Sequence, residues 1–344
     1  MLTIAIVALE AWHAAPLERA WREQGHRVVV VTSDPDGFPG ADVRRTLLGR
    51  VVAPAGRLGA ASVALPAFTR RARRLLEPER PDIVVTFPGT ALELIGLAPT
   101  TLLLADGGRS EAVAEHPDAQ ARRRAPFASR CDQELRGTVV VVPTAHLASP
   151  SAWHLTAPAV IVPGLPEPTA VAPTAPDGPL RLMTVGAPGW DQGTDRLDVV
   201  ARLAGTEYIT VVDTGGEVDD DLAPGLRFVG EQDRDGRAEV LRHSHAYVHL
   251  ARTTSGAAAG LEALAGGVPV LATESSVLAD FCAAGAGAVV PDFASREDYE
   301  DALGRIRREW NSMSARAREL ARERPWSVVA DEVLALAKGG ARVA

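Results

Sequence analysis

The chain has 344 residues, a length that predicts about two domains. Apolar residues make up 46% and charged residues 23% of the sequence, which is the composition of a globular protein. This excludes a disordered chain, a collagen and a small disulfide-stabilised scaffold. The formal net charge of −8 argues against a general nucleic-acid binder, which needs a basic face, and more weakly against an anionic membrane surface as the main partner.

Cysteine usage and hydropathy indicate the compartment. Cys131 and Cys282 lie far apart in the sequence without metal-type spacing, which is typical of a protein from a reducing compartment. The sequence opens directly on a predicted strand and shows no signal peptide. No apolar run approaches the ~20 residues of a membrane span. We therefore expect a cytoplasmic protein without a transmembrane segment.

Short β-branched runs alternate with longer amphipathic stretches along the whole chain. The runs predict strands that are buried on both faces, as in parallel sheets, and the stretches predict helices. The predicted strands are Leu2–Ala8, Val28–Thr32, Ile83–Thr86, Thr101–Leu104, Val139–Val142, Ala159–Val162, Leu180–Val185, Tyr208–Val212, Leu226–Val229, Ala246–Leu250, Val268–Ala272 and Ala288–Val290. The predicted helices are Pro16–Gln24, Ala67–Leu76, Asp195–Leu203, Gly236–Arg242, Gly256–Ala265, Ser276–Ala283, Ser295–Glu309 and Trp326–Ala337. This alternation predicts an α/β fold with doubly wound parallel sheets.

A segment with six prolines, Pro163–Pro179, separates two strand–helix arrays of similar size. Proline lacks a backbone donor and stiffens the chain, so this segment predicts a linker. Ligands of open α/β sheets bind beyond the carboxyl ends of the strands, so a cleft between two domains is the expected site. The expected organisation is a Rossmann-like domain over residues 1–165, a linker over 166–179 and a second Rossmann-like domain over 180–322. A C-terminal helix within 323–344 is expected to return to the N-terminal domain.

A run of small residues, Thr253–Gly260, follows a predicted strand and opens a predicted helix. Small side chains let a ligand approach the backbone, and the free N–H groups of a helix N-terminus suit a phosphate. Glu262 falls about two turns into this helix, between apolar neighbours. One interpretation is that Glu262 is a functional carboxylate. The other is that this is a core helix, in which the small residues allow tight packing and Glu262 is only exposed to solvent.

Four segments carry a family resemblance. They are Val185–Leu197, Thr254–Val270, Ala159–Leu165 and Arg324–Ala330. They resemble four segments of the retaining glycosyltransferases of the GT-B fold, family-4 type. In the same order, these are the Gly-Arg-Leu-x3-Lys-Gly-x-Asp-x-Leu segment, the Glu-x7-Glu segment, the strand that ends the first domain, and the Trp-containing helix that returns to the first domain. The N-terminal half fits this family more loosely.

The resemblance implies an enzyme that moves a sugar from a nucleotide-sugar donor to a small-molecule or saccharide acceptor with retention. It implies that the C-terminal domain binds the donor, with Glu262 on the ribose hydroxyls, and that no metal or other cofactor is needed. The implied donor-binding residues are Gly186, Gln192, Gly193, Arg252, Thr253, Thr254, Ser255, Gly256, Ala257 and Glu262.

Three positions depart from the family pattern. The family's Arg and Lys, which hold the donor diphosphate, are Ala187 and Gln192, and the first Glu of Glu-x7-Glu is Thr254. Because charge-assisted hydrogen bonds are roughly twice as strong as neutral ones, the loss of both cations should impair chemistry on a standard donor. Arg252 and His249 are the nearest replacements, and an atypical donor is expected.

Two loops of the first domain are candidates for the acceptor side. Asp106, before Gly107, takes the place of a His that touches the donor sugar in relatives, although Asp before Gly is also ordinary turn chemistry. Glu10, Trp12 and His13 follow the first strand, where Trp12 could stack on a sugar or pack a helix start. We expect Asp106 and His13 in catalysis, and Glu10, Trp12, His13 and Gly107 around the acceptor.

Other signals are weaker. Asp219–Asp221 predicts a solvated turn, and His243, His245 and His249 lack the further ligands of a zinc site. Two alternatives to a transferase stay open. One is a catalytically silent GT-B protein that binds a nucleotide or sugar or supports a partner enzyme, and the other is an epimerase-like or phosphorylase-like enzyme on the same fold.

Overall fold

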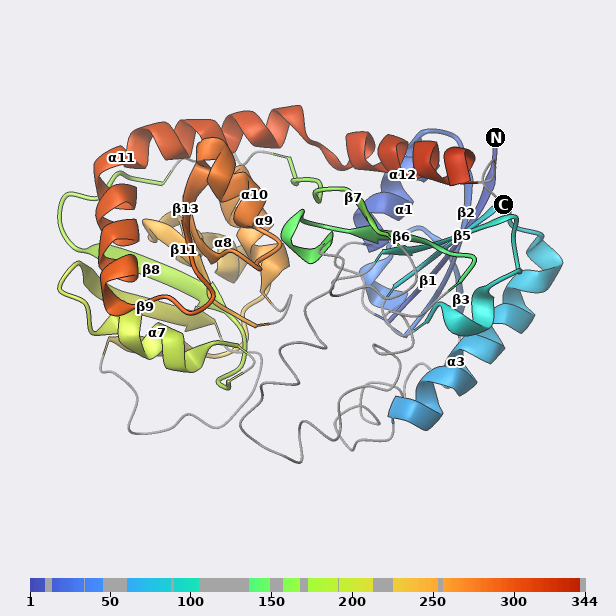
Figure 1. Cartoon of the computed structure of the whole chain (residues 1–344), viewed down its shortest axis with the longest axis horizontal. Helices are drawn as coiled ribbons and strands as arrows, with labels where there is room; N and C mark the ends of the chain where they lie inside the picture. Colours follow the sequence, from blue (N-terminus) through green and yellow to red (C-terminus); the bar gives the residue numbers. More distant parts are fainter. Residues whose placement is uncertain are drawn as a thin grey trace. The chain divides into compact units, whose positions relative to one another are not determined.

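The computed structural model divides the chain into two compact units, shown in Figure 1. Unit 1 comprises Met1–Pro163 and Trp326–Ala344, and unit 2 comprises Gly164–Pro325. The residues that the structure describes are 1–9, 14–33, 35–45, 61–87, 90–104, 136–148, 157–167, 173–190, 192–212, 225–252 and 256–340.

Unit 1 is built on a seven-stranded sheet in the order β3-β2-β1-β4-β5-β6-β7, in which every pairing is parallel. Its strands are β1 (Thr3–Ala8), β2 (Arg27–Thr32), β3 (Asp42–Arg45), β4 (Ile83–Thr86), β5 (Thr100–Leu104), β6 (Val139–Val142) and β7 (Ala159–Val160). Its longer helices are α1 (Ala14–Glu23), α3 (Ala61–Leu76) and α12 (Trp326–Gly340). Its short helical turns are Pro35–Gly37, Glu77–Glu79, Leu92–Leu94 and His146–Ala148.

Successive residues of β1 serve opposite faces of this sheet, because side chains alternate along a strand. Ile4 and Ile6 pack in one apolar cluster with Leu17 and Trp21 of α1 and Val333 of α12. The other face packs against α3, which contributes Leu65, Phe68, Ala72 and Leu76 to a second cluster. Both faces are therefore covered, which explains why β1 and β2 read as continuous apolar runs.

Unit 2 is built on a six-stranded parallel sheet in the order β10-β9-β8-β11-β12-β13. Its strands are β8 (Leu180–Val185), β9 (Thr206–Val212), β10 (Leu226–Val229), β11 (Ala246–His249), β12 (Val270–Thr273) and β13 (Gly287–Val290). Its helices are α7 (Thr194–Ala201), α8 (Arg234–Arg242), α9 (Ala257–Gly266), α10 (Ala279–Phe281), the π-helical turn Cys282–Ala286 and α11 (Arg296–Glu323). The two units thus have the doubly wound parallel α/β architecture that the sequence predicts.

The limits of the two units differ from the predicted ones. In the structure, unit 2 begins at Gly164 and ends at Pro325. Leu165 pairs with Pro325 as a short parallel bridge, and its N–H donates to the Arg324 carbonyl at 2.9 Å. Ala175, inside the proline-rich segment, packs against the core of unit 2. The described part of this segment therefore belongs to unit 2 rather than standing apart from both units.

Individual elements also differ from the sequence prediction. The helix α3 begins at Ala61 rather than Ala67, and the predicted helix Ser276–Ala283 is the short α10 followed by the π-helical turn. The edge strand β3 is not predicted from the sequence. The last long helix of unit 2 is predicted to end at Glu309, whereas α11 runs for 28 residues to Glu323. No helix in the described part of the chain is long and apolar enough to span a membrane.

Candidate functional site

Two loops of unit 2 meet at the carboxyl edge of its sheet. The strands β8 and β11 are parallel neighbours, so the segments that follow them lie side by side. The first leads into α7 and the second into α9, and each helix has a glycine N-cap in the left-handed region, Gly193 at φ 70° and Gly256 at φ 81°. The carboxyl edge of an open parallel sheet is where ligands of such folds bind, so this edge is the candidate site.

Both glycines are required by close backbone contacts as well as by their φ angles. A Cβ on Gly193 would overlap the Leu250 carbonyl at the end of β11. A Cβ on Gly256 would lie 2.5 Å from the Val185 carbonyl oxygen and 2.9 Å from the Tyr247 hydroxyl. Each helix start is thus packed directly on the neighbouring strand, which no larger residue would permit.

Tyr247 anchors the start of α9 through a hydrogen bond from β11. It lies fully buried on β11, and its hydroxyl donates to the Gly256 carbonyl at 2.7 Å. Burial raises the pKa of Tyr247 strongly, although hydrogen bonds with Val185 and Thr184 at the end of β8 act in the opposite direction. The phenol therefore remains a neutral donor that joins β8, β11 and α9 at the candidate site.

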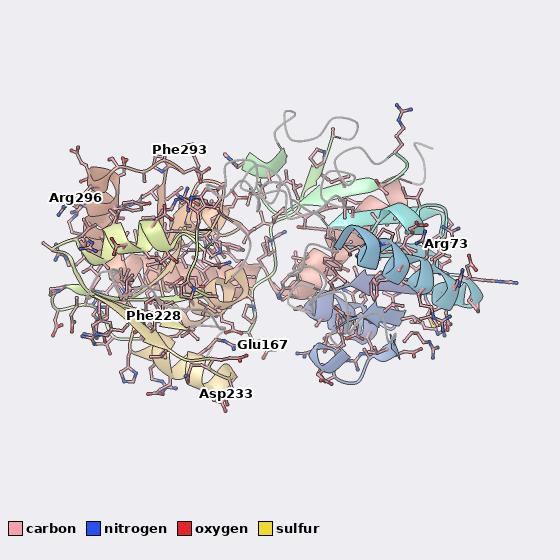
Figure 2. The ribbon with its side chains drawn as sticks, turned by 90° about the horizontal axis from the view of Figure 1, so that it is seen from below. Arg73, Glu167, Phe228, Asp233, Phe293 and Arg296 are labelled. Carbon is pink, nitrogen blue, oxygen red and sulfur yellow. The ribbon has the colours of Figure 1, made fainter. Side chains whose placement is uncertain are left out.

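Gln192 lies in the loop between β8 and α7 and packs against Gly186. Its side-chain oxygen is buried and has no hydrogen-bond partner among the described residues. That oxygen would lie 2.6 Å from a Cβ on Gly186, and the Gly186 φ of 151° also disfavours other residues. Gly186, Ala187 and Gln192 line a small hollow that Phe228, labelled in Figure 2, also borders. An unpartnered amide oxygen in this position can accept a hydrogen bond from a ligand.

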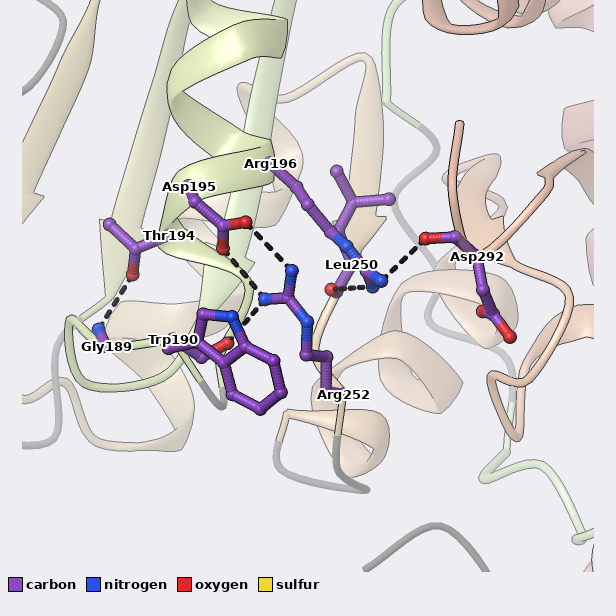
Figure 3. Close-up of polar contacts among 8 residues, drawn as sticks. All are labelled: Gly189, Trp190, Thr194, Asp195, Arg196, Leu250, Arg252 and Asp292. Carbon is purple, nitrogen blue, oxygen red and sulfur yellow. Dashed lines mark hydrogen bonds and ion pairs between the residues drawn. The ribbon is translucent and has the colours of Figure 1, made fainter. Parts of the chain in front are cut away.

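Among the described residues, Arg252 makes three hydrogen bonds at this edge (Figure 3). Its guanidinium donates to both carboxylate oxygens of Asp195 at 2.8 Å and to the Trp190 carbonyl at 2.7 Å. It also stacks on the Trp190 ring, 4.1 Å from the ring centroid. Burial raises the pKa of Asp195, but the hydrogen bond and charge of Arg252 outweigh it, so this pKa lies below its usual range.

Arg196 is a second cation beside Arg252, also drawn in Figure 3. It donates to the Leu250 carbonyl at 3.0 Å and to the Asp292 carbonyl at 2.6 Å. Burial and the nearby charge of Arg252 lower the pKa of Arg196 from its usual value. Two guanidinium groups therefore stand at the edge where β8, β11 and β13 end.

Glu262 lies on the second turn of α9 with about one third of its side chain exposed. Its carboxylate is 3.7 Å from Nε of Arg237 on α8, a loose ion pair. Arg237 in turn donates to the Gln232 carbonyl at 3.0 Å, just ahead of the α8 N-cap Asp233 that Figure 2 labels. The partly exposed carboxylate can accept further hydrogen bonds, and the sequence did not predict Arg237 as its partner.

His249 is the second residue that the sequence offers as a replacement for the family's cations. It is buried at the end of β11, and its Nδ1 lies 2.8 Å from the Ser276 hydroxyl. His245 is buried nearer the start of the strand, where its Nδ1 accepts from the Arg181 N–H at 3.1 Å, and burial lowers its pKa. Within the described ranges, His, Cys, Asp and Glu side chains form no group of three that could hold a metal.

Several predicted site residues lie outside the described residues. These are Glu10, Trp12, His13, Asp106, Gly107, Thr253, Thr254 and Ser255, together with the Asp219–Asp221 turn. Of the predicted donor-side residues, the structure brings together Gly186, Gln192, Gly193, Arg252, Gly256 and Ala257 on adjacent loops, with Glu262 two turns along α9.

Five residues that contact the candidate site residues at this edge were not predicted from the sequence. These are Trp190, Asp195, Arg196, Arg237 and Tyr247. One signal was available for Asp195, because an acidic residue in the first turn of a helix marks its N-terminus. Its pairing with Arg252 depends on the neighbourhood of β8 and β11, which the sequence does not show.

Comparisons with known proteins agree with this architecture. The profile of "Glycosyltransferase Family 4" matches residues 11–163, and that of "Glycosyl transferases group 1" matches residues 220–324. No curated protein matches the chain in sequence.

Several solved structures resemble the chain over nearly their full lengths. Sucrose-phosphate synthase from Thermosynechococcus elongatus has a TM-score of 0.72 at 16% identity, covering all of both chains. WaaG, a glycosyltransferase of lipopolysaccharide biosynthesis, has a TM-score of 0.63 at 17% identity, covering 98% of this chain and 100% of its own. The Anabaena protein HepE, solved with UDP and glucose, has a TM-score of 0.62 at 14% identity, covering 97% and 98%. At these identities the likeness concerns the fold.

Proposed function

Because this chain is a glycosyltransferase of the GT-B fold and the family-4 type, we propose that it moves a sugar from a nucleotide-sugar donor to a small-molecule or saccharide acceptor with retention. In this reaction the bond from the anomeric carbon to the donor diphosphate breaks, and a bond to the acceptor oxygen forms on the same face of the sugar. The acceptor proton passes to an oxygen of the departing diphosphate. No side chain of this chain serves as the nucleophile in this proposal.

The observation that carries the proposal is the pair of adjacent, glycine-capped helix starts at the carboxyl edge of unit 2. Gly193 and Gly256 place the N–H groups of α7 and α9 on neighbouring loops, which favours an anionic diphosphate. Glu262, partly exposed on α9, would accept hydrogen bonds from the ribose hydroxyls. Gln192 offers a neutral contact in the adjoining hollow.

Charge compensation in this proposal comes from the protein itself. The N-terminus of α9 and the guanidinium of Arg252 would stabilise the negative charge that develops on the departing diphosphate. The reaction then requires no resident metal or other cofactor. An atypical donor remains part of the proposal, since Ala187 and Gln192 stand where relatives carry cations.

The acceptor would bind in unit 1. Glu10, Trp12, His13 and Gly107 are the residues we propose around it, with Asp106 and His13 assisting catalysis. A nucleic acid is not a proposed partner, given the net charge of −8. We place the protein in the cytoplasm, a proposal supported by the scarcity of cysteine and by the free, buried Cys282.

Calorimetric titration with UDP, GDP and ADP tests the donor proposal. We expect one of these nucleotides to bind, and Glu262→Ala to weaken it at least tenfold, because the two ribose hydroxyls lose a charged acceptor. Glu300→Ala is the matched control, since it removes an exposed, helical, Arg-paired glutamate from α11.

Failure of every nucleotide to bind, or equal effects of the two variants, would contradict the nucleotide-sugar proposal. Nucleotide binding without sugar transfer to any acceptor in a saccharide and small-molecule panel would instead indicate the catalytically silent alternative.

A further inference from the structure

In the ion pair between Arg252 and Asp195, the Asp195 carboxylate occupies a position on the guanidinium that another anion could take. We propose that the Arg252 guanidinium binds the diphosphate of the nucleotide, and that the Asp195 carboxylate competes with this diphosphate for the same guanidinium. The inference deepens the proposed function and rests on it for the class of ligand. It makes Asp195 a residue that lowers nucleotide affinity rather than one that supports it.

The cation of this pair is held firmly. The guanidinium carbon Cζ lies over the Trp190 ring, 4.1 Å from its centroid, and one guanidinium nitrogen donates to the Trp190 carbonyl at 2.7 Å (Figure 3). These two contacts do not involve Asp195. The guanidinium can therefore keep its place when its carboxylate partner changes.

The anion of the pair is the exposed partner. The side chain of Asp195 is 52% exposed, whereas that of Arg252 is only 14% exposed. A carboxylate on the open side of a fixed guanidinium is the group that an incoming anion can displace. Water can solvate the released carboxylate, so the cost of its release is small compared with breaking a buried ion pair.

The contact geometry also suits a phosphate. Asp195 presents two oxygens to two guanidinium nitrogens, both at 2.8 Å, and a phosphate offers the same parallel pair of acceptors. Arg196, the residue after Asp195, adds a second positive charge beside Arg252 (Figure 3). A diphosphate carries more negative charge than one carboxylate and gains more from two neighbouring guanidinium groups.

Asp195 retains a favourable position after release, because it lies in the first turn of α7. A negative side chain there interacts favourably with the helix N-terminus. The same helix start carries Thr194, whose hydroxyl accepts from the Gly189 N–H at 2.8 Å and fixes the loop that bears Trp190. The loop can thus stay in place while Arg252 changes its partner.

A purely structural ion pair predicts the opposite effect of removing Asp195. If Asp195 only holds Arg252 and the loop in place, its loss should weaken nucleotide binding. If Asp195 competes with the nucleotide, its loss should strengthen binding. The sign of one measured change therefore separates the two roles.

The experiment is a calorimetric titration of the full chain with UDP, GDP and ADP, using Asp195→Asn, Arg252→Gln and the control Asp198→Asn. Asp198 lies on the same helix and pairs with Arg202 at 2.8 Å, so its substitution changes the net charge by the same amount. We expect Asp195→Asn to lower the Kd for the bound nucleotide about tenfold and Arg252→Gln to raise it at least tenfold, with Asp198→Asn within about twofold of the native chain. Asp195→Ser replaces Asp195→Asn if that variant does not fold.

An unchanged or higher Kd for Asp195→Asn, with the native chain binding a nucleotide, overturns the exchange and leaves the proposed function in place. No change on Arg252→Gln overturns it as well. If neither the native chain nor folded Asp195→Asn binds any of the three nucleotides, the proposed function and this inference both fail.

Discussion

Gly193 controls the approach of α7 to the end of β11. Its φ of 70° lies in the region that favours glycine, and a Cβ there would overlap the Leu250 carbonyl. Leu250 is also the acceptor for Arg196, so the same carbonyl serves the helix start and the cation beside it. One residue without a side chain therefore allows Trp190, Asp195 and Arg252 to come together.

Gly193→Ala is expected to lower the free energy of unfolding by roughly 2–4 kcal/mol, because the new methyl group needs both a strained φ and a shift of β11. Urea denaturation of the native and variant chains measures the change. Gly189→Ala in the same loop is the control, since its φ is not positive and a Cβ there meets no atom within 4 Å. Equal stability of the two variants would show that the loop does not constrain the sheet edge.

The long helix α11 shows how one element is fixed at its start and along its face. Ser295 and Asp298 form a reciprocal capping box, in which the Ser295 side chain accepts from the Asp298 N–H and the Asp298 carboxylate accepts from the Ser295 N–H at 2.7 Å. Buried residues then recur every three or four positions from Tyr299 through Trp310 to Leu320. The cap sets where the helix begins, and the buried stripe sets how far it continues.

Ser295→Ala is expected to destabilise unit 2 by about 1 kcal/mol, because the first turn of α11 loses its side-chain acceptor. Thermal unfolding followed by circular dichroism measures this loss. Ser312→Ala on the exposed side of the same helix should leave the unfolding temperature nearly unchanged. A comparable loss in both variants would argue against a capping role.

The same cap makes stability depend on pH. Hydrogen bonds from Ser295 hold the pKa of Asp298 below its usual value. A carboxyl whose pKa is depressed on folding contributes stability at neutral pH, and this contribution is lost as the pH falls from the unfolded-state pKa through the folded-state pKa. The stability difference between the native chain and Asp298→Asn should therefore shrink on acidification below about pH 4. A difference that stays constant in unfolding scans from pH 7 to pH 3 would contradict this assignment.

At the scale of the whole molecule, the C-terminal helix α12 is part of unit 1 although the chain reaches it through unit 2. The Trp21 indole donates to the Ala330 carbonyl at 3.1 Å, and the Thr100 hydroxyl donates to the Ala337 carbonyl at 3.2 Å. Val333 is buried in the cluster that also holds Ile4 and Ile6 of the central strand. Unit 1 is therefore complete only when the last helix of the chain has folded onto it.

The helix α3 of the same unit is fixed by a side chain. Its Arg73, labelled in Figure 2, donates to the carbonyls of Glu93 and Ile95.

Val333→Asp is expected to destabilise unit 1 by several kcal/mol, because it places a carboxylate in an apolar cluster without a partner. Amide hydrogen exchange should then accelerate in β1, β2 and α1 but not in β8, β9 and β11. Lys338→Asp, on an exposed position of the same helix, is the control. Faster exchange in both units would show that they unfold as one cooperative body.

Most strands and helices could be predicted from the sequence, and the misses have physical causes. The strand β3 reads Asp-Val-Arg-Arg, because it pairs only with β2 at the edge of the sheet and needs no continuous apolar run. The second half of α11 contains Asn311, Ser312 and Ser314, which lower local helix propensity, and burial of Trp310 and Met313 overrides that preference. In β3 the local pattern is too weak to predict a strand. In α11 tertiary packing overrides the local preference against a helix.

The sequence by itself determined the alternation of buried strands and amphipathic helices, the small-residue loop before α9 and the position of Glu262 within that helix. These features are readable because side-chain periodicity and glycine chemistry act within a few residues. Only the tertiary structure decided that β8 and β11 are neighbours, and hence that Asp195 and Arg252, 57 positions apart, form one ion pair on Trp190. Strand order results from the packing of distant segments against each other, so no local pattern encodes which charged side chains it brings together.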